Sequence, residues 1–359
     1  MSKQYTALGL MSGTSGDGVD ASIIQSDGES KYKVILDKYF EYDRDIYENI
    51  HKLKDNINNS SDLKRLSKEI EKLEKKITLF HVKIAGDLAK DNIDLLGFHG
   101  QTIFHNAEER ISKQLGDGKL LSQLAKKNVV YNFREHDLKN GGQGAPIAPI
   151  FHKLMVIQNK ITLPVTILNI GGIANVTSAS KENKISSSDI GPGNCLIDQW
   201  VRLNSDKNYD EEGKLAKLGK INQIVLKQSL EIFYNNNISK KKSYDVKDFD
   251  LSFVRGLSLE DGAATLTEFT AEIVSKNLLD KKIYVCGGGR KNKFLLESIE
   301  KKINATVQLI DDLGINGDFV ESQAFAYLAI RSYLKLPISF PETTGVKKPC
   351  SGGTVVKIK

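Results

Sequence analysis

The chain has 359 residues, of which 40% are hydrophobic and 27% are charged. This composition excludes a disordered or fibrous protein, and the length fits about two globular domains of ~100–200 residues each. The 51 lysines and arginines outnumber the 45 aspartates and glutamates, which gives a net charge of +6. So mild an excess is typical of a solvated surface and does not indicate a nucleic-acid-binding protein.

Three cysteines occur, Cys195, Cys286 and Cys350, and none of them forms a CxxC pair. An odd number of widely spaced cysteines argues against a disulfide framework or a structural zinc site and suits a reducing compartment. The first residues lack the pattern of a secretory signal, and no run of about 18 apolar residues occurs. We therefore expect a cytoplasmic protein without a membrane span.

The first predicted element is a strand–turn–strand unit over residues 5–24, whose turn is rich in Gly, Ser and Thr. A third strand is predicted at residues 34–36. Apolar residues then recur at steps of three and four over residues 63–84, which predicts one long helix capped by Ser60 to Asp62. A strand over residues 95–98 follows and ends at a polar segment.

The second half begins with a similar strand–turn–strand unit over residues 165–177. The later predicted elements are a helix from about residue 196, a helix over 261–274, a strand over 283–286 and a last helix over 321–334. The repeated layout predicts two mixed α/β domains of related design with a cleft between them. We place these domains at residues 1–130 and 131–340, with the tail, 341–359, returning to the first domain.

The first turn has the composition of a phosphate-binding site. Its glycines expose backbone N–H groups, and Ser12, Thr14 and Ser15 add hydroxyl donors. Asp17 and Asp20 would repel a phosphate unless a cation lies between them, so a nucleotide with Mg²⁺ is the functional interpretation. A plain hairpin turn is the alternative. Two further glycine-rich segments, residues 169–175 and 287–289, follow strands, where α/β domains often bind nucleotides.

Polar residues near these turns are candidates for catalysis. Asp189 precedes a Gly-Pro-Gly segment, so it is predicted to lie at a rigid turn, either as a general base or as an ordinary turn aspartate. His99, with neighbouring polar residues, follows a strand end, where loop residues often meet a ligand. Arg134 can bind a substrate carboxylate with two hydrogen bonds or form a surface ion pair. The chain contains no Walker A, HExxH or GxSxG motif.

Together these segments resemble the anhydro-N-acetylmuramic acid kinase family. The matching segments, in the family's order, are Met11–Asp20, His99–Thr102 with His105, Phe133–Asp137 with Gly141–Pro146, Asn169–Asn175, Asp189–Asn194 and Cys286–Gly289. Two positions depart from the family pattern. Gly16 stands where a larger apolar residue is usual, and Lys241 stands where proline is common.

The resemblance implies an actin-like, hexokinase-type α/β fold of two duplicated ribonuclease H-like domains. It also implies a cytoplasmic, dimeric enzyme of peptidoglycan recycling that uses ATP and Mg²⁺. Such an enzyme opens 1,6-anhydro-N-acetylmuramic acid with water and phosphorylates O6, which gives N-acetylmuramic acid 6-phosphate and ADP. An ordinary sugar kinase of the same fold and an actin-like ATPase switch remain alternatives.

The resemblance also assigns roles to residues of this chain. Asp189 matches the catalytic base, and Mg²⁺ is expected near Asp17. The positions that match ATP contacts are Ser12, Gly13, Thr14, Ser15, Gly16, Asp17, Gly18, Val19, Asn169, Gly171, Gly172, Gly287, Gly288 and Gly289. The positions expected near the sugar are Gln101, Thr102, Arg134 and Glu321.

Overall fold

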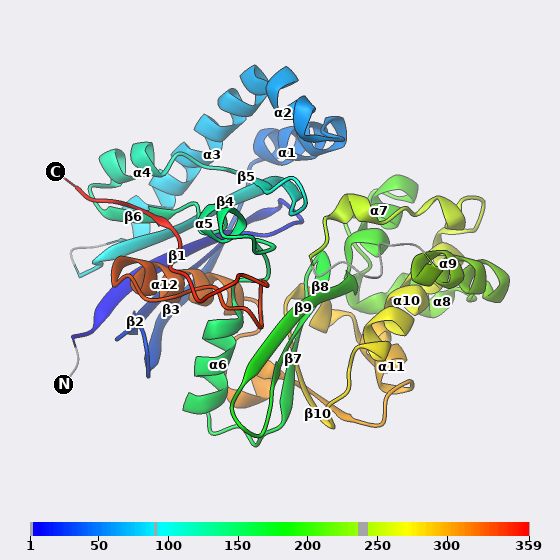
Figure 1. The fold of residues 1–359 in the computed structure, drawn as a ribbon. Helices are drawn as coiled ribbons and strands as arrows, with labels where there is room; N and C mark the ends of the chain where they lie inside the picture. The colour runs from blue at the N-terminus through cyan, green and yellow to red at the C-terminus, as the bar shows by residue number, and fades with distance from the viewer. Residues whose placement is uncertain (1–2, 90–91, 236–242, 359) are drawn as a thin grey trace. The chain divides into compact units, whose positions relative to one another are not determined.

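The computed structural model describes residues 3–89, 92–235 and 243–358. The chain forms two compact units, drawn in Figure 1. Unit 1 comprises residues 1–161 and 319–359, and unit 2 comprises residues 162–318. The basic run Lys240–Lys242, which includes the departure at Lys241, lies outside the described residues. In the described ranges, no helix is long and apolar enough to cross a membrane.

Unit 1 is a seven-stranded sheet covered by helices on both faces. Its strands are β1 (Tyr5–Ser12), β2 (Gly18–Ser26), β3 (Tyr32–Glu41), β4 (Leu95–Asn106), β5 (Ile111–Leu115), β6 (Asn128–Tyr131) and β12 (Thr354–Val356). Its helices are α1 (Arg44–Asn56), α2 (Ser60–Arg65), α3 (Ser67–Leu88), α4 (Gly118–Ala125), α5 (Glu135–Lys139), α6 (Pro149–Gln158) and α12 (Val320–Tyr333).

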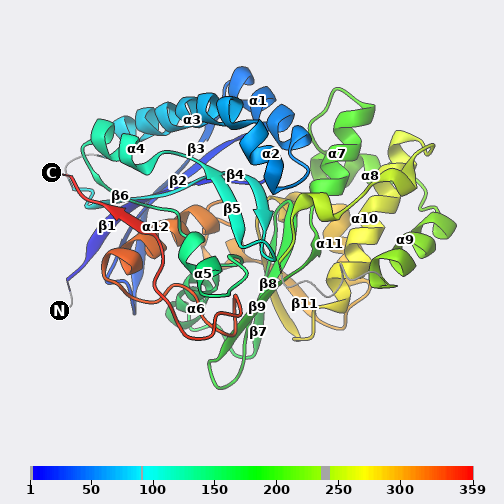
Figure 2. The same ribbon diagram turned by 45° about the horizontal axis from the view of Figure 1, so that its top comes forward.

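Unit 2 is a five-stranded sheet with a group of helices built around α10. Its strands are β7 (Val165–Ile170), β8 (Ile173–Ala179), β9 (Ile185–Pro192), β10 (Lys282–Cys286) and β11 (Thr306–Leu309). Its helices are α7 (Cys195–Asn204), α8 (Lys214–Leu218), α9 (Gln223–Asn235), α10 (Leu259–Lys276) and α11 (Lys293–Glu300). Helix α10 lies beside α8 and α9 (Figure 2).

The two sheets share one topology. Unit 1 has the order β3-β2-β1-β4-β6, and unit 2 has the order β9-β8-β7-β10-β11. In each unit the first three strands along the chain pair antiparallel, and the last two strands of this order extend the sheet in parallel. In unit 1, β5 pairs antiparallel with β4 and stands outside this order. This duplication is that of the actin-like, hexokinase-type fold, so the expected fold class is confirmed.

The units are divided at other positions than the sequence suggested. The boundaries fall after residues 161 and 318 rather than near 130 and 340, so α5, α6 and α12 belong to unit 1. Helix α12 packs on β1, β2 and β4, and the Tyr327 ring of α12 lies 5.6 Å from the Phe151 ring of α6. In the tail, β12 pairs antiparallel with β6. These partners are distant in sequence, and a local pattern does not show them.

Strand β1 shows how the pattern of side chains builds the layers of unit 1. Leu8 and Leu10 are fully buried among residues of α1 and α3 on one face. Helix α12 covers the opposite face of the sheet (Figure 1). A Cβ on Gly9 would be 2.0 Å from the Ser322 carbonyl oxygen and 2.6 Å from the Ala326 backbone nitrogen. The absence of a side chain at this position lets the helix lie directly on the sheet.

The long helix predicted over residues 63–84 is interrupted. Helix α2 ends at Arg65, and α3 begins at Ser67. The cap also differs, because the side chain of Asn59, not of Ser60, accepts the Ser61 N–H and forms a capping box with Asp62. The apolar periodicity continues across the break, so it predicts the buried face but not the interruption.

His81 of α3 makes the stability of unit 1 sensitive to acid. Its Nδ1 donates to the Ile77 carbonyl at 2.8 Å, and its Nε2 has no hydrogen-bond partner within the described part of the chain. Burial lowers the pKa of His81 from 6.5 to about 4. The unfolded chain therefore binds the proton more tightly than the folded chain. We expect the free energy of unfolding to fall as the pH drops from about 6.5 to 4, by on the order of 3 kcal/mol from this residue.

Urea midpoints between pH 7 and pH 4 measure this loss. His81→Leu is expected to flatten the dependence on pH, even where it lowers the midpoint at pH 7. Leu73→Ala, at a buried residue of α3 that carries no titratable group, is the control and should lower the midpoint while keeping the wild-type slope. An unchanged slope in His81→Leu would contradict the prediction.

Candidate active site

The glycine-rich turn of unit 1 begins at Ser12, the buried last residue of β1. Its hydroxyl can donate to either of two acceptors, Gln101 Oε1 at 2.5 Å and the Gly18 carbonyl oxygen at 2.9 Å. The Ser12 Oγ in turn accepts a hydrogen bond from the Tyr42 hydroxyl at 3.1 Å. Gln101 Nε2 donates to the Gly13 carbonyl at 3.0 Å. Ser12 and Gln101 therefore fix both ends of the turn through side-chain hydrogen bonds that are buried or half-buried.

The middle of the turn is held by its own backbone and by α1. Gly16 has a φ of +66°, and its N–H donates to the Gly13 carbonyl at 3.2 Å. Lys54 Nζ donates to the Thr14 carbonyl at 2.8 Å, and Ser15 Oγ donates to Asp17 Oδ1 at 2.6 Å. Glycine suits this positive φ, so the departure at Gly16 is compatible with a closed turn.

The turn of unit 2 at Gly171 and Gly172 holds the start of α7. The Gly172 carbonyl accepts from the N–H of Gly193 at 2.9 Å, and the Gly171 carbonyl accepts from the N–H of Asn194 at 2.8 Å. A Cβ on Gly193 would lie 2.2 Å from the Gly171 oxygen. The carbonyl groups of Gly171 and Gly172 therefore hold the segment that leads into α7 within unit 2.

Asp189 lies within strand β9, not at the turn that the sequence predicted. It is opposite Asn175 of β8, next to a bulge in the pairing, and its side chain is 8% exposed. Its Oδ2 accepts from the Tyr244 N–H at 2.9 Å. Burial, together with the charge of Asp189, raises the pKa of Tyr244 to about 12. Tyr244 could not be predicted as a partner of Asp189, because the contact joins residues 55 positions apart.

The triple-glycine segment lies beside the end of β7. Gly287 has a φ of +81°, and a Cβ there would lie 2.4 Å from Asn169 Oδ1. The structure therefore brings together two of the predicted nucleotide-binding positions, Asn169 and Gly287, at the carboxyl ends of neighbouring parallel strands. A Cβ on Gly288 would meet nothing within 4 Å. Open space at this position suits a ligand that approaches the backbone.

Arg134 is fixed by a neutral histidine. Its Nε and Nη2 donate to His99 Nε2 at 3.2 and 3.0 Å, and its Nη1 donates to the Gly144 carbonyl at 2.8 Å. His99 Nδ1 donates to the Gly100 carbonyl at 2.8 Å. Burial, with the Arg134 charge beside it, lowers the pKa of His99 well below its usual range. The ring thus holds its proton on Nδ1 and presents a lone pair to Arg134.

The other residues expected near the sugar lie in unit 1. Gln101 is fully buried and is already engaged by Ser12 and Gly13, so in this structure it shapes the turn. Thr102 Oγ1 accepts from Gln114 Nε2 at 3.1 Å. Glu321 lies in the first turn of α12.

Asp137 organises the loop that follows Arg134. Its Oδ1 accepts from the Gly144 N–H at 2.6 Å, and its Oδ2 accepts from Thr344 Oγ1 at 2.5 Å. Gly144 is the same residue whose carbonyl accepts from Arg134. The spacing of Asp137 from Arg134 belongs to the matched pattern, but the sequence did not indicate that the tail supplies Thr344.

Asp17 is the predicted position for Mg²⁺. Its carboxylate is exposed beside the hydroxyl of Ser15. No group of three or more His, Cys, Asp or Glu side chains that could hold a metal occurs among the residues that the structure describes. Mg²⁺ is commonly bound by one or two carboxylates plus phosphate oxygens and water. The Asp17 carboxylate and the Ser15 hydroxyl supply oxygen atoms that fit this way of binding Mg²⁺.

The duplicated sheets define the class of protein, which is an α/β protein of the actin-like, hexokinase-type fold. The sequence model described as anhydro-N-acetylmuramic acid kinase matches residues 5–357. The chain belongs to the anhydro-N-acetylmuramic acid kinase family, as the resemblance in the sequence suggested.

Individual relatives agree with this family assignment. A protein of Pelagibacter ubique named anhydro-N-acetylmuramic acid kinase is 59% identical, with 99% of this chain and 100% of that protein covered. A protein of the same name from Zymomonas mobilis is 38% identical, with 97% and 99% covered. One from Agrobacterium fabrum is 35% identical, with 99% and 100% covered.

Proposed function

We propose that the protein is an ATP-dependent kinase that opens 1,6-anhydro-N-acetylmuramic acid with water and phosphorylates O6. The products are N-acetylmuramic acid 6-phosphate and ADP. The observation that carries this proposal is the family match over nearly the whole chain, with 59% identity to a relative of that name. The sugar comes from peptidoglycan, so we place the reaction in cell-wall recycling, in the cytoplasm, where ATP is available, and expect a homodimer.

Asp189 is the proposed general base. Its carboxylate takes a proton from water, the water oxygen bonds to the anomeric carbon, and the bond from that carbon to O6 breaks. The released O6 attacks the γ-phosphorus, and the bond to ADP breaks. The Tyr244 N–H, at 2.9 Å from Oδ2, supports this role, because it fixes the orientation of the carboxylate.

The proposal assigns ATP contacts to three turns. Residues 12–19 of unit 1 would bind phosphate oxygens through backbone N–H groups and hydroxyls, and Asp17 would hold Mg²⁺. The bound Mg²⁺ would neutralise negative charge that develops on the phosphates. Unit 2 would contribute Asn169 with the glycines at 171–172, and the glycines at 287–289 would receive the adenosine. The closed hydrogen bonding around Ser12 supports a preformed phosphate turn.

Arg134 is the proposed partner of the sugar's carboxylate. Arg134→Ala should raise the KM for the anhydro-sugar by about tenfold, the usual loss for one charge-assisted hydrogen-bonded contact, and leave the KM for ATP unchanged. Arg134→Lys, which keeps the charge but not the planar fork, should have an intermediate KM. Steady-state kinetics with each substrate varied in turn measure this split. A sugar KM equal to that of the wild type in Arg134→Ala would remove the assignment.

The function is tested by coupling ADP release to a spectrophotometric assay with ATP and the anhydro-sugar. Glucose and N-acetylglucosamine are the control acceptors. Reaction in ¹⁸O-water should place label at the anomeric position of the product during turnover, with a correction for exchange through the open form of the product. An ordinary sugar kinase would act on open sugars without that label. An ATPase switch would release ADP at a rate that no sugar changes.

A further inference from the structure

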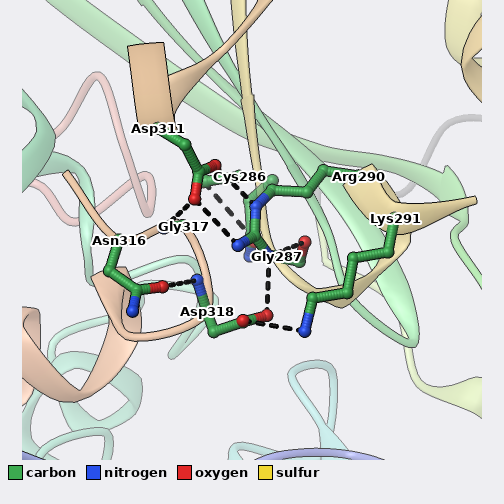
Figure 3. A network of polar contacts seen from close by, with 9 residues as sticks. Cys286, Gly287, Arg290, Lys291, Asp311, Asn316, Gly317 and Asp318 are labelled. Carbon is green, nitrogen blue, oxygen red and sulfur yellow. Dashed lines mark hydrogen bonds and ion pairs between the residues drawn. The ribbon is translucent and has the colours of Figure 1, made fainter. Parts of the chain in front are cut away.

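A buried arginine lies directly after the triple-glycine segment. Arg290 is 7% exposed, and its guanidinium makes a two-pronged contact with Asp311, with Nε to Oδ2 at 2.7 Å and Nη2 to Oδ1 at 3.0 Å. Its Nη1 donates to Asp318 Oδ1 at 2.6 Å and to the Gly287 carbonyl at 3.2 Å. Figure 3 shows these contacts converging on one side chain.

The same network also holds the other polar group of Gly287. The Gly287 N–H donates to the Gly317 carbonyl at 3.0 Å, and the Gly317 N–H donates to Asp311 Oδ1 at 3.3 Å. A Cβ on Gly317 would lie 2.4 Å from Arg290 Nε, so the loop can approach the guanidinium only with glycine at this position. Both backbone polar groups of the first glycine in the turn are therefore tied to Arg290 and its partners (Figure 3).

The charges of this network balance. Arg290 and Lys291 are the cations, Asp311 and Asp318 are the anions, and Lys291 Nζ lies 2.8 Å from Asp318 Oδ2. Burial alone would lower the pKa of Arg290, but the bonds to the two carboxylates outweigh burial and raise it. A network of balanced charge contributes little net attraction for a phosphate. Its effect on a ligand must come from the shape that it gives to the glycine turn.

We propose that Arg290 is a positioning residue for nucleotide binding, which fixes the backbone of Gly287 through its contacts with Asp311 and Asp318. The inference rests on the proposed function, in which residues 287–289 receive the adenosine of ATP. The arginine itself need not touch the nucleotide. Without Arg290, the Gly287 carbonyl loses the hydrogen bond from the guanidinium. The backbone of residues 287–289 is then no longer held in the conformation that binds the nucleotide.

The test measures the Kd for ADP by isothermal titration calorimetry and the KM for ATP and for the sugar by kinetics. Arg290→Met is expected to raise the Kd for ADP and the KM for ATP by about tenfold, with the KM for the sugar unchanged. Arg290→Lys, which can reach only one carboxylate, should fall between Arg290→Met and the wild type. Asp311→Asn weakens the contact that holds the guanidinium without removing the arginine. This variant replaces Arg290→Met in the test if Arg290→Met does not fold.

The coupling between Arg290 and Asp311 distinguishes an effect on ADP binding through the turn from a general loss of stability. The double variant Arg290→Met/Asp311→Asn should bind ADP no more weakly than Arg290→Met, because both changes act through one contact. Lys302→Met is the matched control in unit 2. Lys302 also bridges two carboxylates, with Nζ 2.5 Å from Glu268 and 2.6 Å from Glu272, but it lies outside the turn. It should lower the melting temperature and leave the Kd for ADP unchanged.

Gly288→Val distinguishes a failure of the nucleotide assignment of residues 287–289, which belongs to the proposed function, from a failure of the role of Arg290 alone. Gly288→Val places a side chain in open space, and it should abolish ADP binding if the turn receives the nucleotide. Unchanged binding in Gly288→Val would overturn both the assignment of the turn and the role of Arg290. Loss of binding in Gly288→Val, with wild-type ADP affinity in folded Arg290→Met or Asp311→Asn, would overturn the role of Arg290 alone.

Discussion

Asp189→Asn is expected to lower kcat by about 10³-fold, within the range found for the loss of a positioned general base. The amide has nearly the same shape as the carboxylate, and its oxygen can still accept from the Tyr244 N–H. The fold and the affinity for ADP should therefore be retained. What is lost is the ability to take the proton from water, so the C1–O6 bond is no longer opened at the wild-type rate.

The measurement is kcat from steady-state kinetics with saturating ATP and anhydro-sugar, and the rate of the chemical step from single-turnover kinetics, together with ADP binding and thermal melting. Asp210→Asn is the matched control, because Asp210 is also a buried aspartate of unit 2 whose carboxylate accepts two backbone N–H groups, those of Leu215 at 2.7 Å and Ala216 at 2.9 Å. It should lower stability and leave kcat near the wild-type value. A kcat for Asp189→Asn within a few-fold of the wild type would remove the base assignment.

Gly9→Ala is expected to destabilise the protein by about 3 kcal/mol or more, at the upper end of the cost of overpacking. The added Cβ would lie 2.0 Å from one backbone atom of α12 and 2.6 Å from another. Backbone atoms cannot rotate away as a side chain can, so the whole helix has to move off the sheet. Helix α12 also rests on Gly97 of β4, where a Cβ would lie 2.4 Å from the Phe325 carbonyl oxygen, and the displacement would therefore disturb both strands.

Urea unfolding measures this loss of stability. Gly86→Ala provides the control, because Gly86 lies in α3 and a Cβ there meets nothing within 4 Å. In an exposed helix, alanine in place of glycine should raise the free energy of unfolding by about 0.5–1 kcal/mol. The same chemical change is thus predicted to have opposite signs at the two positions. A Gly9→Ala variant as stable as the wild type would show that α12 does not need this close approach.

The elements that the sequence predicted well are those with local signals. The apolar strands before each glycine turn correspond to β1, β7 and β10, and the last helix is found at Val320–Tyr333. Strand β9 was missed, because its run of serines from Ser186 to Ser188 has no strong strand preference. Pairing with β8 makes it a strand, so tertiary contacts override local propensity there.

The candidate active site could be predicted in part, because some of its residues have a local signal in the sequence. Glycine at positions 13, 16 and 287 is visible in the sequence, and so is an isolated aspartate at 189. The partners that fix these groups are distant in sequence. Gln101 holds a turn 88 positions earlier, and Arg290 reaches Asp318, 28 positions later. Residue types alone show which groups are available but not which of them are already occupied by neighbours.

The division of the chain has a consequence for its synthesis. Unit 2 is one continuous segment, residues 162–318, inserted into unit 1, whose last helix and last strand come from residues 319–359. A ribosome releases the chain from the N-terminus, so every residue of the inserted segment emerges before α12 exists. Unit 2 can therefore complete its core first, while β1 and β4 must wait for the helix that covers Gly9 and Gly97.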